Sequence, residues 1–277
     1  MAIKALSLFS GIGGGDIALE WCGVDVVGMC EIDSYCQEIL KQHFPNTPLF
    51  SDIKTLTPEQ FGEIDILLTT FPCQPVSVAG KQLGDKDDRW LWRENLKFIR
   101  TNKPIFVIGE NVRGLLTKGL CDIESDLREE GYEVRSYVLS AKDIGAIHLR
   151  ERVFIIGYKP RRQSTNSPSN GCNGKQESSR DRETYERAEE RKDKTEWPKG
   201  CGEVRTLLQP TPPTESWGTL PQFRGVDDGL PERLDKTEKQ RIKALGNSVM
   251  PQQIYPFIKS CVEVLRRGYE INNRNRF

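Results

Sequence analysis

A cysteine between two prolines, directly after an apolar run, is the part of this sequence best suited to chemistry. The segment Thr70–Ser77 reads Thr-Phe-Pro-Cys-Gln-Pro-Val-Ser, and the run 64–69 comes before it. Proline fixes φ and donates no backbone N–H, so Cys73 is expected to leave a strand on a stiff, non-helical loop. A cysteine is more often inert packing than a nucleophile, but prolines are poor choices for a plain core strand. The pattern therefore favours a thiol held at the edge of a sheet.

Polar groups that could serve such a thiol lie at the ends of two later apolar runs, after the first and at the start of the second. Glu110 and Asn111 come after the run 105–108, where partial desolvation would raise the pKa of the carboxyl and make it a usable acid. In the segment Arg150-Glu151-Arg152, alternation along a strand places both arginines on one face, where they could hold an anion or a carbonyl. The simpler alternatives are that Glu110 and Asn111 form a solvated strand end and that residues 150–152 form an exposed strand edge of mixed charge.

A glycine-rich turn near the start of the chain could receive a cofactor. The segment Phe9-Ser10-Gly11-Ile12-Gly13-Gly14-Gly15 separates an apolar run from a helical pattern, and glycine lets backbone approach a ligand closely. Glu31 ends the next expected strand, twenty residues after Gly11, where an acid can hold ribose hydroxyls. Asp52 lies in the turn Ser51-Asp52-Ile53, which comes between the expected strands 24–30 and 64–69, at the place where another strand would end. The spacing also fits a dinucleotide, so it does not select the cofactor.

Short β-rich runs alternate with helical patterns through residues 1–159, which predicts an α/β fold with a mixed, mostly parallel sheet. The expected strands are 5–9, 24–30, 64–69 and 105–108, with 133–140 and 152–158 as an antiparallel pair. The expected helices are 16–21, 33 or 34 to 43, about 88–100, 122–130, 237–245 and an amphipathic final helix, 252–267. Pro251 is expected to open that last helix.

Composition sets limits on the function. The 277 residues carry 40 basic and 40 acidic side chains, so any nucleic-acid surface must come from local clustering. The two histidines, His43 and His148, and the absence of a C-x-x-C pair give no basis for a metal site. The eight cysteines are interpreted as reduced thiols of a cytoplasmic protein. No apolar stretch is long enough to span a membrane.

The sequence predicts three parts. Residues 1–159 form a catalytic, cofactor-binding domain, and residues 235–277 return to it. Between them, residues 160–202 are rich in Ser, Asn, Arg, Lys and Glu and nearly lack aliphatic side chains, so they cannot bury enough surface to fold tightly alone. Residues 160–234 are expected to be partly flexible.

In this order, the segments resemble the cytosine-C5 DNA methyltransferase family, above all its short bacterial and prophage members. The matching residues are Phe9-Ser10-Gly11-Ile12-Gly13-Gly14, Glu31, Asp52, Phe71-Pro72-Cys73-Gln74-Pro75, Glu110-Asn111-Val112, Arg150-x-Arg152 and Gly246-Asn247-Ser248-Val249. They cover residues 1–159 and 241–260. The resemblance implies a Rossmann-like methyltransferase fold, with residues 160–234 as a small, irregular target-recognition region.

The resemblance also implies roles. The activity would be methyl transfer from S-adenosyl-L-methionine to C5 of a cytosine flipped out of double-stranded DNA, leaving S-adenosyl-L-homocysteine, without a metal. Cys73 would add to C6, Glu110 would hold or protonate N3, and Arg152 would hold O2, with Arg150 and Asn111 also in the catalytic site. The cofactor site would comprise Phe9, Ser10, Gly11, Ile12, Gly13, Gly14, Glu31 at the ribose, Ile32, Asp52 at the adenine, Ile53, Pro72, Asn247, Ser248 and Val249.

A cytoplasmic monomer is implied as well, and a cognate restriction endonuclease is left open as a second partner. His148 stands where the family usually has Gln, a position that mainly aids loop closure, so activity is expected to be retained. The alternatives are an RNA cytosine methyltransferase, a non-catalytic DNA-binding relative and a nicotinamide-dependent oxidoreductase. The presence of Cys73, Glu110 and Arg152 argues against the second, and hydride transfer offers the Pro-Cys-Gln-Pro loop no role.

Overall fold

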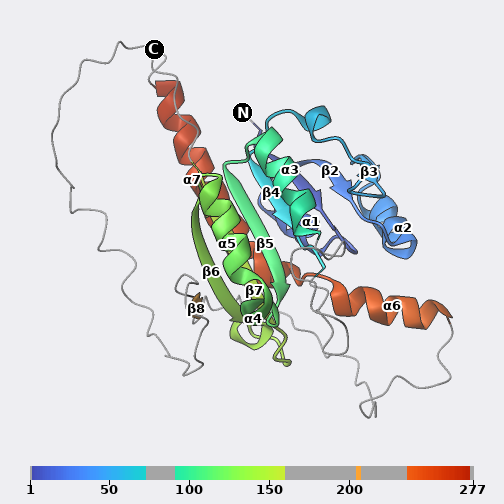
Figure 1. The fold of residues 1–277 in the computed structure, drawn as a ribbon. Coiled ribbons are helices and arrows are strands. Elements are labelled where there is room, and N and C mark those ends of the chain that lie inside the picture. Colours follow the sequence, from blue (N-terminus) through green and yellow to red (C-terminus); the bar gives the residue numbers. More distant parts are fainter. Residues whose placement is uncertain (1, 73–90, 160–203, 207–235, 275–277) are drawn as a thin grey trace, which may run out of the picture.

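The computed structural model of the chain describes residues 2–72, 91–159, 204–206 and 236–274 (Figure 1). Cys73 and most of the expected target-recognition region lie outside these residues. The three-part division of the chain therefore stays a prediction.

The described strands form one eight-stranded sheet in the order β3-β2-β1-β4-β5-β7-β6-β8. The strands are β1 (Lys4–Leu8), β2 (Asp25–Cys30), β3 (Leu49–Phe50), β4 (Ile66–Thr69), β5 (Phe106–Val112), β6 (Glu133–Ser140), β7 (Glu151–Tyr158) and β8 (Val204–Thr206). Strand β7 runs antiparallel to both of its neighbours, and every other described pairing is parallel. The mostly parallel α/β sheet and its antiparallel pair, β6 and β7, are confirmed.

Helices cover both faces of the sheet (Figure 1). The α-helices are α1 (Gly14–Trp21), α2 (Ser34–His43), α3 (Trp92–Asn102), α4 (Leu115–Lys118), α5 (Leu120–Glu129), α6 (Lys236–Asn247) and α7 (Pro251–Arg274), and the 3-10 helices are η1 (Pro58–Phe61) and η3 (Ala141–Ile144). Apolar side chains of α3 and α5 pack on one face in one core cluster, and those of α1 and α7 pack on the other in a second. Burial on both faces explains the continuous apolar runs of the central strands.

Several expected boundaries are wrong, because tertiary contacts extend the elements. Strand β5 continues through Val112, since its ladder with β7 runs as far as the pair Val112 and Arg152. Glu110 and Asn111 therefore lie inside a strand, not after it. Helix α6 ends at Asn247, two residues beyond the expected end at residue 245, and α7 runs past Arg267. Pro251 does open α7, and the Asp33 side chain caps α2 as expected, accepting from two backbone N–H groups.

Two further expectations can be compared with the described residues. The thiols of Cys22, Cys30, Cys36 and Cys261 are free and buried, but Cys121 is disulfide-bonded, contrary to the expectation of reduced thiols throughout. Among the helices that the structure describes, none combines the length and apolarity needed to cross a bilayer.

Candidate active site

The segments that sequence analysis singled out converge on one edge of the sheet. Parallel strands end on the same edge, so the residues after β1, β2, β3 and β4 meet there, together with the last residues of β5. Because β7 is antiparallel, its first residues lie at this edge too, with Arg152 opposite Val112. The topology thus gathers the glycine loop, Glu31, Asp52, the Phe71–Pro72 segment and Glu110.

Glu110 and Arg152 form a buried ion pair at this edge. The Arg152 Nε atom lies 3.0 Å from Glu110 Oε1, and the two side chains are only 14% and 8% exposed. Burial raises the pKa of Glu110 to about 7, against the lowering effects of Arg152 and Arg150. A carboxyl whose pKa lies near neutrality can hold or release a proton at working pH. Glu151 points to the opposite face, where it pairs with Arg113, as strand alternation predicts.

Arg150 joins this site to the segment between α6 and α7. Its Nη1 donates to the carbonyl of Gly246 at 2.9 Å, and its Nη2 donates to the carbonyl of Ser248. Gln253, buried in the first turn of α7, donates through Nε2 to the carbonyls of Leu139 and Arg150 at 3.1 and 3.0 Å. Arg150 is half-buried, and its two hydrogen bonds hold the end of α6 and Ser248 against the start of β7.

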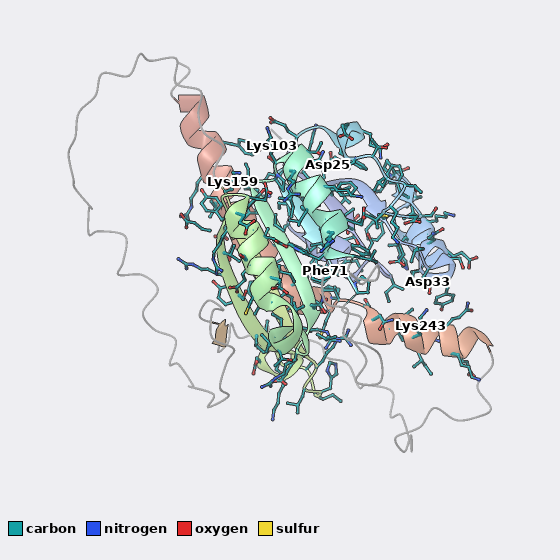
Figure 2. The ribbon with its side chains drawn as sticks, in the orientation of Figure 1. Asp25, Asp33, Phe71, Lys103, Lys159 and Lys243 are labelled. Atoms are coloured by element: carbon teal, nitrogen blue, oxygen red, sulfur yellow. The ribbon has the colours of Figure 1, made fainter. Side chains whose placement is uncertain are left out.

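Asn111 holds the chain segment that leads to Cys73. Its Nδ2 donates to the carbonyl of Phe71 at 2.8 Å, and this bond is buried. The Phe71 ring packs against Trp92 of α3, whereas Pro72 is exposed. Cys73 lies outside the described residues, but the two residues before it leave β4 at the edge that holds Glu110. Figure 2 labels Phe71 near the lower end of α3, where that helix begins with Trp92.

The glycine loop leaves room for a ligand on one side and is tightly packed on the other. Gly11 has a φ of +58°, and a Cβ placed there would meet no atom within 4 Å. At Gly14, a Cβ would lie 2.0 Å from the carbonyl oxygen of Val249, so only glycine lets α1 touch the α6–α7 segment. Phe9 adopts a left-handed φ of +60°, which costs roughly 1–2 kcal/mol for a residue with a side chain. Such strain is typical of functional sites.

Acidic and apolar groups beside this loop fit a nucleoside. Glu31 accepts hydrogen bonds from the backbone N–H groups of Gly11 and Asp33, each at 2.8 Å. Each of its oxygens keeps a second lone pair for a hydroxyl donor. The neighbouring Ile32 side chain is 71% exposed, which suits contact with a flat ring, and Asp52 caps its own turn through the N–H of Lys54. The residues present therefore fit the expected S-adenosylmethionine.

The other expected cofactor residues divide into packed and accessible groups. Ser10 and Ile53 are buried, and the Ser10 hydroxyl lies 2.9 Å from that of Ser7. Val249 is buried in the contact with Gly14, Ser248 is half-buried and Asn247 is exposed. Lys243 of α6 donates to Asp33 at the start of α2, at 3.0 Å, and Figure 2 shows both side chains at the same edge of the molecule. This ion pair holds α6 close to Asp33, whose backbone N–H donates to Glu31.

Asp16 is a buried acid beneath the loop. Within the described part of the chain, neither carboxyl oxygen accepts a hydrogen bond of normal geometry. Burial raises its pKa from 3.8 to about 7, while the Ser7 hydroxyl opposes that rise and Glu20 adds to it. At pH values between 3.8 and about 7, the folded protein therefore holds on this side chain a proton that the unfolded chain has lost.

We expect Asp16→Asn to flatten the pH dependence of stability. Between the unfolded and folded pKa values, the free energy of unfolding falls as pH rises, by up to about 1.4 kcal/mol per pH unit for one proton. The variant should lose this part of the slope in denaturant unfolding between about pH 5 and about pH 7. The matched variant Asp25→Asn, at an exposed strand position, should keep the wild-type slope. Equal slopes for wild type and Asp16→Asn would contradict the assignment.

Sequence analysis missed two residues that organise the site. The Thr70 hydroxyl donates to the carbonyl of Phe9 at 2.6 Å, and nothing in the sequence around it indicates this contact. Gln253 could have been found, because it precedes Phe257 and Cys261 at four-residue spacing on the apolar face of α7, where a polar side chain needs a buried partner.

Comparisons with known proteins agree with this geometry. The sequence model of the family described as C-5 cytosine-specific DNA methylase matches residues 3–219. The Type II methyltransferases M.NgoBI of Neisseria gonorrhoeae and M.HaeII of Haemophilus aegyptius are 36% and 38% identical over 160 residues. Each match covers 56% of this chain and 50% of the relative, so the chain spans about half the length of the curated relatives it matches. A solved structure of a mutant DNMT2 of Spodoptera frugiperda shares the fold, with a TM-score of 0.53 and 23% identity over 76% of this chain and 56% of that one.

Proposed function

Because the chain belongs to the C-5 cytosine-specific DNA methylase family, we propose that it transfers a methyl group to C5 of a cytosine in a specific double-stranded DNA site. The observation that carries this proposal is the buried pair of Glu110 and Arg152 at the edge where the strand before Cys73 ends. An acid of near-neutral pKa and a fixed cation suit the N3 and O2 atoms of a pyrimidine.

The proposed reaction activates an unreactive ring carbon by addition. The Cys73 thiolate bonds to C6 of the flipped cytosine, and the ring electron pair shifts toward N3, which Glu110 protonates. Arg152 holds O2, and Arg150 keeps the strand start in place. S-adenosylmethionine, when bound, supplies the methyl group that C5 takes up. N3 then returns its proton to Glu110, C5 loses its proton to a base, and breakage of the S–C6 bond restores the aromatic ring and the thiolate.

In this proposal the glycine loop and Glu31 hold the methyl donor. The open space beside Gly11 admits the ligand, Glu31 accepts from the ribose, and Ile32 and Asp52 lie at the adenine. S-adenosylhomocysteine is the product that stays in this site. Double-stranded DNA is the proposed partner, within a Type II restriction–modification setting such as the names of the relatives indicate. A cytoplasmic monomer is part of the same proposal.

We expect Glu31→Ala to weaken S-adenosylhomocysteine binding by about 10- to 100-fold, the range for a lost charge-assisted hydrogen bond. Isothermal titration calorimetry measures this directly. Glu38→Ala, an exposed change on α2, the helix that follows Glu31 in the chain, is the control and should bind like wild type. Unchanged affinity in Glu31→Ala would contradict the assigned donor site.

The function itself is tested by sequencing 5-methylcytosine in DNA from a host that lacks such methylation and expresses the chain. We expect methylation at one short sequence and none with Cys73→Ala. RNA from the same cells serves as the comparison. Methylated RNA with unmethylated DNA would overturn the choice of substrate, and no methylation of either by a chain that folds would overturn the proposal.

A further inference from the structure

One side-chain hydrogen bond joins the glycine loop to the segment that leads to Cys73. The Thr70 backbone N–H donates to the carbonyl of Leu8 at 3.2 Å and so prolongs the parallel pairing of β1 and β4. The Thr70 hydroxyl then donates to the next carbonyl, that of Phe9, at 2.6 Å. Thr70 thus binds two successive carbonyls of the opposite chain, one through its backbone and one through its side chain.

Phe9 is the residue that most needs such a partner. Among the described residues, Phe9 and Lys103 are the non-glycine residues with positive φ, and Lys103 only ends α3. Phe9 opens the proposed donor site, immediately before Ser10, whose N–H donates to the carbonyl of Cys30 at 3.0 Å. If the Phe9 peptide relaxed, its carbonyl would turn away from Thr70, and the open face of the loop beside Gly11 would change.

The other side of Thr70 leads to the nucleophile. Thr70 directly precedes Phe71, whose carbonyl Asn111 holds, and Pro72, whose ring restricts the backbone before Cys73. A shift of Phe9 would therefore break its hydrogen bond with Thr70 or displace Thr70, and Thr70 is followed directly by Phe71, whose carbonyl is held by Asn111. The Thr70 hydroxyl thus connects the glycine loop, the proposed donor site, with the segment that leads to Cys73.

We propose that Thr70 is a positioning residue: its hydroxyl fixes Phe9 in the conformation that receives the methyl donor and couples donor binding to the Phe71–Pro72 segment, which precedes Cys73 in the chain. The inference rests on the proposed function. Thermodynamic coupling of this kind is reciprocal, so the donor site and the DNA site each change the affinity of the other by the same factor.

The neighbouring residue supplies a matched control. The Thr69 hydroxyl is buried at the end of β4 and donates to Asn95 Oδ1 of α3 at 2.8 Å, not to the glycine loop. Thr69→Val and Thr70→Val each replace one hydroxyl by a methyl group and keep the β-branched shape. A merely structural role of Thr70 would make the two variants behave alike.

The experiment measures S-adenosylhomocysteine affinity by calorimetry for wild type, Thr70→Val, Thr70→Ser and Thr69→Val. Thr70→Val should bind about 3- to 10-fold more weakly, the loss expected for one hydrogen bond to a partly buried carbonyl. Thr70→Ser keeps the hydroxyl and should return to within about twofold of wild type. Thr69→Val should lower the melting temperature and leave the affinity unchanged.

A second measurement tests the coupling. The affinity for a target duplex is measured with and without S-adenosylhomocysteine, and the factor by which it tightens should shrink in Thr70→Val but not in Thr69→Val. Equal affinities and equal factors in wild type and Thr70→Val would overturn the inference while leaving the proposed function intact. Failure of the wild type to bind S-adenosylhomocysteine would instead overturn the proposed function.

Discussion

Replacing Cys73 with alanine is expected to lower methyl transfer by about 10⁴-fold or more, the scale of loss when a covalent nucleophile is removed. S-adenosylhomocysteine binding should persist, because the glycine loop, Glu31 and Ile32 remain. A tritiated-donor assay on target duplex measures the first quantity, and calorimetry measures the second. The split between turnover and donor affinity separates loss of the nucleophile from loss of the fold.

Cys30 is the control thiol for this prediction. It ends β2 beside the proposed donor site, but burial, aided by the charges of Glu31 and Asp52, raises its pKa to about 12. A thiol with such a pKa stays protonated at neutral pH and cannot act as a nucleophile. Turnover that survives in Cys73→Ala and is lost in Cys30→Ala would contradict the assignment.

Glu110→Gln is expected to lower turnover by about 10²- to 10⁴-fold, the usual contribution of a positioned general acid. The amide keeps the size of the side chain but cannot give a proton to N3. Donor affinity should stay within about twofold of wild type, because Glu110 contacts the base and not the donor. If Glu110→Gln weakened donor binding as much as Glu31→Ala, the division of roles between the two acids would be wrong.

The pH profile follows from the same residue. Burial raises the pKa of Glu110 to about 7 despite Arg152 and Arg150, so the protonated fraction of the acid falls as pH rises through that value. Turnover of the wild type should therefore fall on the alkaline side of about pH 7, and Glu110→Gln should lack this limb. Glu151→Gln, which changes the acid on the opposite face of the strand, should keep it.

Local patterns were enough to predict the direction in which the reactive groups point. Alternation in Arg150-Glu151-Arg152 places Arg152 toward Glu110 and Glu151 toward Arg113, and both ion pairs are present. The apolar runs before Phe71 and before Glu110 become neighbouring parallel strands, β4 and β5, whose ends must share an edge. Parallel strands end on the same edge of a sheet whatever their order, so the site edge could be anticipated.

Contacts between distant segments could not be predicted, since they depend on tertiary register. Arg150 reaches the carbonyls of Gly246 and Ser248, which lie 96 and 98 residues further along the chain. The bond from Asn111 to the Phe71 carbonyl requires β5 to extend two residues beyond Gly109 and so depends on its pairing with β7. No local pattern encodes either distance.

The short strand β8 shows a related limit. Val204–Thr206 falls in a polar region that has no strand pattern of its own, yet it pairs with the free edge of β6 in parallel. An exposed sheet edge offers backbone groups to any extended segment, and the edge, not the sequence of the segment, determines such pairing. The boundaries of the expected target-recognition region stay a prediction, because most of residues 160–234 lie outside the described part of the chain.

The most direct test of the account uses a target duplex in which 5-fluorocytosine replaces the methylated cytosine. A base can remove a proton from C5 but cannot remove fluorine, so elimination is blocked. The enzyme should therefore stall after methyl transfer with its sulfur still bonded to C6. Mass spectrometry of the denatured protein should find this adduct on the peptide that contains Cys73, and only when S-adenosylmethionine was present. An adduct that persists in Cys73→Ala, or that maps to another residue, would contradict the account.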